Sequence, residues 1–226
     1  MQSATGGNNL HGVPARPKAH TVKLYDYLPS GNSYKVRLVC AKLGLPYTHV
    51  PVNILEGESR TPEFLAMNPA GQIPLLVLDD GRTLAESNAI IQYLASIPEG
   101  GTDLVPADDY DRAKMQQWMF WEQYRHEPAI AVARFINHYY SVERASELPS
   151  LLEKGEAALE VMEGHLARHD WFVGDSCTLA DVSLYAYTHV ADEGGFDLAQ
   201  FPYVQAWLAR FSAQDDHIGM DWVPES

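Results

Sequence analysis

The chain has 226 residues, of which 46% are hydrophobic and 20% charged, and this composition is typical of a globular protein. Its formal net charge is −14, which argues against a nucleic-acid or anionic-membrane partner, because such partners are bound by clustered Lys and Arg side chains. No apolar run reaches the roughly 18 residues that a membrane-spanning helix needs.

The N-terminal residues 1–20 are rich in Gly, Asn and Pro and lack an apolar segment. We expect them to form a mobile tail rather than a signal peptide. The two cysteines, Cys40 and Cys177, have neither CxxC nor metal-ligand spacing. They are therefore predicted to be free thiols in a reducing compartment, which indicates a cytoplasmic location.

The acidic charge is unevenly distributed along the chain. Residues 21–96 carry six basic and seven acidic side chains (net −1), whereas residues 107–226 carry eight and twenty-one (net −13). This asymmetry supports two domains with these bounds. Residues 97–106, which contain two prolines and two adjacent glycines, are the predicted linker between them.

The first elements form a strand, a helix and a second strand. Residues 21–28 alternate as a strand does, and the turn 29–32 ends them. Apolar residues then recur at helical spacing as far as Leu43, and residues 47–52 supply the second strand. A crossover helix of this kind joins parallel strands.

A short helix, a hairpin and a further helix complete the first domain. Thr61-Pro62 opens the short helix, with the Thr61 hydroxyl as its cap. The hairpin turns at 79–81, and Ser87 is predicted to cap the last helix. The hairpin strands and this helix are expected at residues 75–78, 83–85 and 87–95. The order βαβαββα predicts an α/β domain with a mixed, four-stranded sheet.

Beyond the linker, every long segment has apolar residues at a spacing of three to four and is predicted to be helical. Thr178 and Asp181 have the spacing of a capping box, which would begin a buried helix. The helices are expected at about 107–142, 149–169, 178–190 and 202–211. The second domain is therefore predicted to be all α.

Residues 68–88 contain two features that together predict a notch for an extended peptide. Pro74 opens a strand but cannot donate to a sheet ladder, so the backbone of Ile73 is available to a ligand, above all if the bond between them is cis. Ser87 begins a helix whose N–H groups and positive dipole end suit a carboxylate. An ordinary edge strand is the alternative for Pro74, and Ser87 would be an N-cap in either case.

Three motifs in this order give the chain a family resemblance. They are Pro29–Arg37 after the first strand, Gln72-Ile73-Pro74 with Glu86-Ser87, and the Thr178–Asp181 box. With them the chain resembles the cytosolic glutathione S-transferases, in particular a bacterial, serine-type branch, over nearly all of residues 21–215. The resemblance implies a thioredoxin-like first domain, an all-helical second domain, a homodimer and a glutathione site.

The resemblance also implies roles for individual residues. Ser30 matches the activating hydroxyl of the serine-type branches, and Asn32 is its helper or replacement, although without the other motifs Ser30 would be interpreted as a helix cap. The γ-glutamyl end of glutathione is expected at Glu86 and Ser87, and its cysteine is expected to pair with Ile73. The implied glutathione-binding residues are Arg60, Gln72, Ile73, Pro74, Glu86 and Ser87.

In this family a hydrophobic substrate binds between the turn at 27–33 and the long helix. The residues that this assigns to the pocket are Leu28, Trp118, Trp121, Tyr124 and Arg125. A packed core stripe explains the positions on the long helix equally well. His165 and His169 have a spacing that could hold a metal ion, but no carboxylate or thiol partner is evident, so we expect no metal.

The resemblance therefore implies a detoxifying glutathione transferase. Glutathione would be its co-substrate, held as a thiolate for attack on a small hydrophobic electrophile. Glutathione-dependent disulfide or peroxide reduction, or isomerisation at the same site, is one alternative. A non-catalytic module that binds ligands or proteins is the other.

Overall fold

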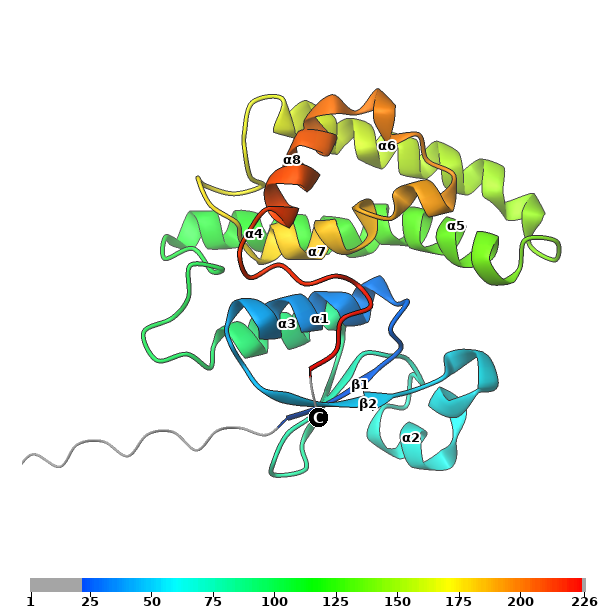
Figure 1. The fold of residues 1–226 in the computed structure, drawn as a ribbon, viewed down its shortest axis with the longest axis vertical. Coiled ribbons are helices and arrows are strands. Elements are labelled where there is room, and N and C mark those ends of the chain that lie inside the picture. Colours follow the sequence, from blue (N-terminus) through cyan, green and yellow to red (C-terminus); the bar gives the residue numbers. More distant parts are fainter. Residues whose placement is uncertain (1–21, 225–226) are drawn as a thin grey trace, which may run out of the picture.

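A computed structural model of the chain describes residues 22–224, so the predicted tail at residues 1–20 lies outside the described residues. The described chain forms a sheet with helices and, stacked on it, a bundle of helices (Figure 1). Within these residues, no helix is both long and apolar enough to cross a membrane.

The first domain contains a four-stranded mixed sheet in the order β2-β1-β3-β4. β1 runs parallel to β2 with Val22 opposite Tyr47, and β3 runs antiparallel to both β1 and β4. The strands are β1 (Val22–Asp26), β2 (Tyr47–Pro51), β3 (Leu75–Val77) and β4 (Thr83–Ala85). The predicted order and the mixed sheet are confirmed, although β1 ends two residues before the predicted residue 28.

Helix α1 (Gly31–Lys42) lies between the sheet and the helical domain, beside α3 (Ser87–Ala95) and under α7 (Leu179–Thr188) (Figure 1). Nearly every residue of α1 from Gly31 to Cys40 is buried. A helix covered on all sides needs no polar face, which explains why the sequence of α1 shows little amphipathic pattern. The short α2 (Pro62–Met67) begins as predicted, with the Thr61 hydroxyl accepting from the Phe64 N–H.

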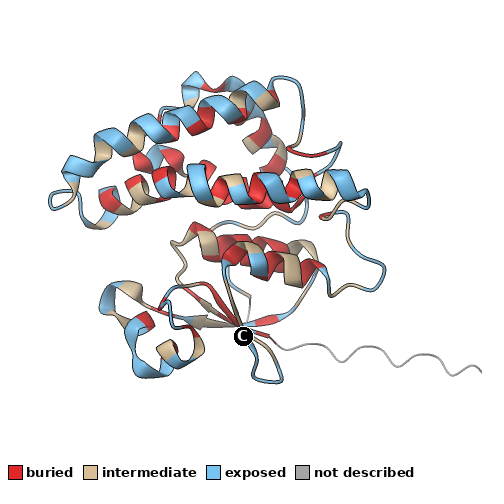
Figure 2. Cartoon of the chain, turned by 180° about the vertical axis from the view of Figure 1, so that it is seen from behind, coloured by how far each residue is buried: buried red, intermediate tan, exposed pale blue. Residues whose placement is uncertain are grey.

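The second domain is helical, as predicted. Its long first helix is divided into α4 (Asp109–Trp121), a π-helical turn (Glu122–His126) and α5 (Glu127–Tyr139). The others are α6 (Leu148–Leu166), α7 and α8 (Pro202–Ser212). Buried residues line the sides on which these helices face one another and α1 (Figure 2).

The capping box at the start of α7 is confirmed. The Asp181 carboxylate accepts from the Thr178 N–H at 2.9 Å and from the Trp207 indole N–H at 3.0 Å. Every residue of α7 is buried. The box therefore sets the first turn of the helix on which α1 packs.

Both cysteines are free, as predicted, and the structure shows both to be buried. Burial raises the pKa of the Cys40 thiol to about 12 and also raises that of Cys177. Neither thiol forms an appreciable amount of thiolate at neutral pH.

Two histidines, His126, which is buried, and His189, which is half-buried, are uncharged at neutral pH. Burial lowers the pKa of His126 and of His189 to about 4. The Thr188 hydroxyl donates to the Leu184 carbonyl, so His126 Nε2, 2.9 Å away, must donate to it. His126 Nδ1 is buried with no partner among the described residues. A proton added there would create an unpaired buried cation.

We expect the free energy of unfolding to fall as the pH is lowered from about 6.5 to about 4. The unfolded chain takes up protons in this window that the folded imidazoles do not, and one such group contributes at most about 3 kcal/mol. Urea denaturation at a series of pH values measures the slope. His126→Gln should reduce the dependence of the free energy of unfolding on pH, whereas His169→Gln, at an exposed position, should leave it unchanged. Equal slopes in the native chain and in both variants would show that His126 does not cause the loss of stability.

Candidate functional site

A cavity of about 410 Å³ lies where the edge of the sheet meets the long helix. The first domain contributes Asn32 and all six residues predicted to bind glutathione: Arg60, Gln72, Ile73, Pro74, Glu86 and Ser87. The second domain contributes Gln123 and Glu127. Residues from four separate segments of the first domain thus meet at one site.

The loop before β3 forms one wall of the cavity. The bond between Ile73 and Pro74 is cis, and Pro74 is buried at the start of the strand. The Asn68 side chain donates to the Gln72 carbonyl at 2.8 Å, which holds the loop from behind. Arg60 donates to the Ala70 carbonyl at 2.9 Å and so lies at the exposed rim.

The start of α3 forms a second wall, and here one prediction is wrong. Ser87 is the first residue of the helix, and its N-cap is Glu86, with φ 66° and ψ 110°. The chain turns sharply at this left-handed residue, a conformation that is strained by about 1–3 kcal/mol in a non-glycine residue. No side chain caps the α3 N terminus, so its N–H groups can bind an anionic ligand.

The orientation of the Asn32 amide follows from its neighbours. Lys35 Nζ is 2.8 Å and Ser87 Oγ 3.1 Å from Asn32 Oδ1. An ammonium group can only donate, so the atom facing Lys35 must be the oxygen. The Asn32 Nδ2 group therefore points to Glu127 Oε1, 3.2 Å away, and has a second N–H for a ligand in the cavity.

A buried charge network supports Asn32 from below. Lys35 and Glu122 are both fully buried and form an ion pair at 2.9 Å. The Glu122 carboxylate also accepts from Asn88, Gln123 and Ser183 at 2.9–3.2 Å. Because all partners are bound, Lys35 has little freedom to leave Asn32.

Ser30 is the N-cap of α1, and its Oγ accepts from the Ser33 N–H at 3.3 Å. The Tyr187 ring packs against Gly31, and burial, above all, raises the pKa of its hydroxyl. The backbone before Ser30 is held by Arg134, which donates to the Pro29 carbonyl at 2.6 Å. Asn32 lines the cavity directly, whereas Ser30 lies beside it, at the helix cap.

Glu127 brings a carboxyl group to the cavity. Burial, above all, raises its pKa, and the charges of Glu122 and Glu86 act in the same direction. The sequence analysis missed both Glu127 and Gln123. Their positions depend on the π-helical turn, which shifts the helical register and leaves no signal in the apolar spacing.

The residues predicted to form the hydrophobic pocket differ in their surroundings. Trp118 is 8% exposed and packs on Phe172 and His165, with ring centroids 4.8 and 5.0 Å away. For Trp118, the structure supports the packed-core alternative. Trp121 lies against the same core, Tyr124 is 76% exposed, Arg125 stacks over it, and Leu28 is half-buried.

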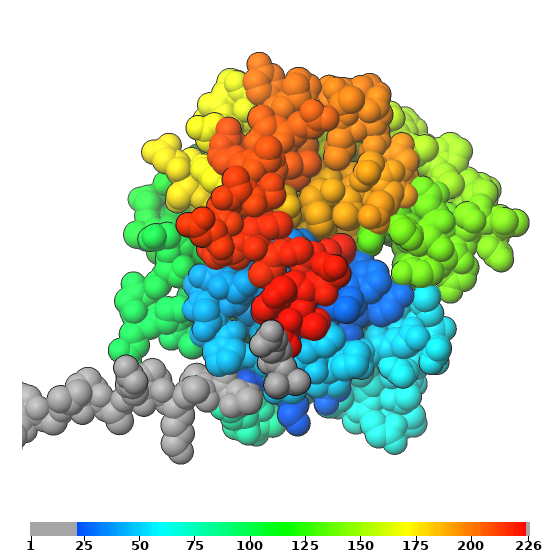
Figure 3. Space-filling view, in the orientation of Figure 1, coloured from blue at the N-terminus to red at the C-terminus, as the bar shows by residue number. Residues whose placement is uncertain are grey.

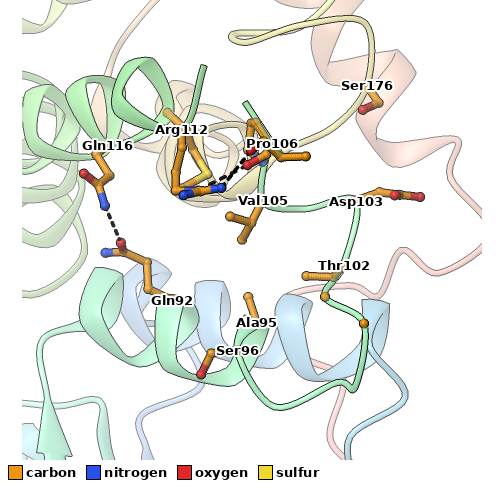
Figure 4. A pocket seen from close by; sticks show the side chains of 14 residues that line it. Gln92, Ala95, Ser96, Thr102, Asp103, Val105, Pro106, Arg112, Gln116 and Ser176 are labelled. Atoms are coloured by element: carbon orange, nitrogen blue, oxygen red, sulfur yellow. Dashed lines mark hydrogen bonds between the residues drawn. The ribbon is translucent and has the colours of Figure 1, made fainter. Parts of the chain in front are cut away.

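Among residues 22–224, no group of three or more His, Cys, Asp or Glu side chains could hold a metal ion. A cavity of about 660 Å³ lies where the linker passes the end of α3 and the start of α4 (Figure 4). Its arginine, Arg112, donates to the backbone carbonyls of Pro106 and Ala107. That contact is structural, and none of the predicted site residues lies there.

Gly31, between Ser30 and Asn32, allows α1 to approach α7. A Cβ at Gly31 would lie 2.7 Å from two ring atoms of Tyr187 and 2.8 Å from the Ala186 carbonyl oxygen. Gly31→Ala should therefore destabilise the fold by about 1–3 kcal/mol, as overpacking does, and displace the flanking site residues. Thermal unfolding measures this. Gly164→Ala in α6, where nothing lies within 4 Å, should be neutral or slightly stabilising; equal effects of the two would contradict the close contact.

The chain is similar to known protein families, to individual proteins and to solved structures. The family model "Glutathione S-transferase, N-terminal domain" matches residues 29–97, and "Glutathione S-transferase, C-terminal domain" matches residues 120–215. A zeta-class glutathione S-transferase of Euphorbia esula is 37% identical, over 84% of this chain and 83% of its own. The maleylacetoacetate isomerase of Rhizobium meliloti is 35% identical, over 87% and 94%.

Three solved structures share the fold. A possible glutathione S-transferase from Rhodopseudomonas palustris is 51% identical with a TM-score of 0.85, covering 90% of this chain and 99% of its own. A glutathione S-transferase from Pseudomonas fluorescens is 48% identical with a TM-score of 0.84, covering 88% and 98%. Ure2p in complex with glutathione is 25% identical with a TM-score of 0.80, covering 89% and 92%.

Proposed function

Because this chain belongs to the glutathione S-transferase family, we propose that it is a glutathione transferase that holds glutathione as a thiolate in the cavity of about 410 Å³. The thiolate attacks a small hydrophobic electrophile. The observation that carries the proposal is the Asn32 amide, whose oxygen faces Lys35 and whose nitrogen is directed to the cavity.

Each end of glutathione has a matching group in the cavity. The γ-glutamyl carboxylate binds at the uncapped start of α3, beside Glu86 and Ser87. The cysteine backbone pairs with Ile73, next to the cis bond. Gln72 and Arg60 lie at the rim, where the glycine carboxylate would emerge.

Thiolate formation requires a modest free energy. Lowering a thiol pKa by about two units takes about 2.7 kcal/mol of differential stabilisation. One charge-assisted hydrogen bond and the dipole of a helix N terminus together supply an amount of this size. Asn32, in the first turn of α1, offers the hydrogen bond at the place where the dipole acts.

Of the two candidate donors, the structure favours Asn32. The Ser30 Oγ already accepts the Ser33 N–H as the cap of α1. Asn32 has an N–H group directed to the cavity. Ser30 then acts mainly by shaping the first turn of α1, and its hydroxyl is the secondary donor.

Isomerisation is the second candidate, because one relative is named a maleylacetoacetate isomerase and another a zeta-class enzyme. Both reactions use the same thiolate. A mixed disulfide with the protein is disfavoured, since both cysteines are buried with raised thiol pKa values. Product analysis separates the routes: a thioether means conjugation, an isomer without loss of glutathione means isomerisation, and oxidised glutathione means reduction.

We further propose a cytoplasmic homodimer. Phe120 and Tyr124, four residues apart on the long helix, are 73% and 76% exposed, and neighbouring exposed apolar side chains of this size can form part of a protein interface. Light scattering of the native protein and of Phe120→Asp tests this. A monomeric native protein would overturn the dimer.

The experiment for the main proposal is the ultraviolet absorbance of bound thiolate as a function of pH. A bound thiol pKa about two units below that of free glutathione supports the transferase. Saturable binding with an unchanged thiol pKa would instead support a non-catalytic ligand-binding protein. No binding would overturn the glutathione site itself.

A further inference from the structure

The segment that follows α8 lies across α1 and reaches the sheet. Residues 213–224, red in Figure 1, run from the helical domain over α1 to the first domain, and Figure 3 shows them lying on its surface. Lys42 Nζ binds the Asp216 carboxylate at 2.6 Å. The Tyr34 hydroxyl donates to the Ile218 carbonyl at 2.5 Å. The C-terminal segment is thus attached to α1 along its length.

Arg37 makes the last and deepest of these attachments. Its side chain is fully buried, in a chain whose other arginines are at least partly exposed within residues 22–224. Arg37 Nη1 donates to the Met220 carbonyl and, at 3.2 Å, to the Trp222 carbonyl. Its Nε lies 3.1 Å from the Asp26 carboxylate, which balances the charge. The C-terminal segment therefore supplies two of the acceptors that this buried guanidinium needs.

The same guanidinium reaches the loop in front of the candidate site. Arg37 Nη2 donates to the Leu28 carbonyl at 2.8 Å. The next carbonyl, of Pro29, is held from the opposite side by Arg134, and the Ser30 N–H closes the turn on the Tyr27 carbonyl at 2.8 Å. Two arginines from different parts of the chain thus fix consecutive carbonyls just before Ser30.

We propose that Arg37 is a positioning residue through which the C-terminal segment holds the loop 27–30, and with it the first turn of α1, in the geometry that stabilises the thiolate. The role in thiolate stabilisation rests on the proposed function. A guanidinium presents its donors in a rigid plane. The position of the Leu28 carbonyl on Nη2 is therefore coupled to that of the Met220 and Trp222 carbonyls on Nη1. Without the segment, the guanidinium would lose the Met220 and Trp222 carbonyls and turn toward water for new acceptors, and it would move together with the Leu28 carbonyl.

Such coupling acts on catalysis more than on glutathione affinity. The groups expected to bind the tripeptide backbone, at Ile73 and Ser87, lie on other segments. A displacement of about 1 Å in a reacting group can lower a rate by about 100-fold. A displaced first turn of α1 would therefore lower kcat and raise the thiol pKa, with little change in the KM for glutathione.

The test compares the native chain with a chain that ends at Ile218 and with Arg37→Met. Trp222→Ala is the matched control. Arg37 contacts the backbone carbonyl of Trp222, which this variant keeps, and the Trp222 side chain that it removes is 41% exposed. In the truncated chain and in Arg37→Met, we expect kcat to fall by about 10-fold and the pKa of the bound thiol to rise by about one unit. Trp222→Ala should match the native chain in both quantities. Partial unfolding lowers the active fraction but does not shift the pKa of the thiol that remains bound.

Hydrogen exchange of residues 27–34, measured without glutathione, gives a second readout. The truncated chain and Arg37→Met should exchange faster there, because the Ser30 N–H is held in the turn. Native exchange and native thiol pKa in both proteins would overturn the inference. Faster exchange, with no lowered thiol pKa in the native chain, would overturn the proposed function and leave Arg37 as the positioning residue of the loop.

Discussion

Asn32→Ala should lower kcat/KM for glutathione conjugation by about 10²–10³-fold, the effect of removing one donor that stabilises a developing anion. The bound thiol pKa should rise toward that of free glutathione, because the Asn32 N–H directed to the cavity is lost. Steady-state kinetics and thiolate absorbance measure the two effects. Ser30→Ala should have the smaller effect, since the Ser30 hydroxyl already serves the helix cap.

Two further variants separate the donor from its surroundings. Asn32→Asp keeps the shape but places an oxygen toward Glu127, so its loss of activity should be at least as large. Gln123→Ala removes a long contact with Asn32, 3.4 Å, and one of several donors to the Glu122 carboxylate, so its loss of activity should be smaller than that of Asn32→Ala. A larger loss in Ser30→Ala than in Asn32→Ala would assign the thiolate to the hydroxyl instead.

Lys35→Met should lower the free energy of unfolding by about 3–5 kcal/mol, because it leaves the carboxylate of Glu122 buried without its cation. Urea denaturation measures the change. The double variant Lys35→Met with Glu122→Leu should be destabilised by less than the sum of the single changes. Strict additivity would show that the two groups do not interact.

An exposed ion pair provides the control for this prediction. Arg82 and Asp80 lie 2.7 Å apart with side chains 74% and 54% exposed. Arg82→Met should change the free energy of unfolding by less than about 1 kcal/mol. The two ion pairs have nearly equal distances, so the expected difference between the two losses of stability comes from the burial of Lys35 and Glu122.

The order of elements in the first domain could be predicted because Pro and Gly separate segments of clear periodicity. The turn after β1, the Thr61 cap and the hairpin before α3 are all encoded locally, within a few residues. The residues expected to bind glutathione also lie next to such local signals, at Pro74 and at the start of α3. For this reason sequence reasoning could bring them to one cavity.

The remaining features depend on contacts between distant parts of the chain. Glu86, rather than Ser87, is the N-cap of α3, because the chain turns through a left-handed residue there. Gln123 and Glu127 reach the cavity by way of a π-helical turn, which a period of 3.6 residues does not predict. Trp118 has the spacing of a pocket residue but is buried against Phe172.

The burial of Cys40 and Cys177 has a practical consequence for chemical labelling. Thiolates attack electrophilic reagents, and neither protein thiol ionises appreciably at neutral pH. In the folded protein, an alkylating dye should therefore report on bound glutathione with almost no background from the protein. The same dye added in denaturant should label two sites per chain, so one reagent can follow both the activation of the tripeptide and the unfolding of the protein.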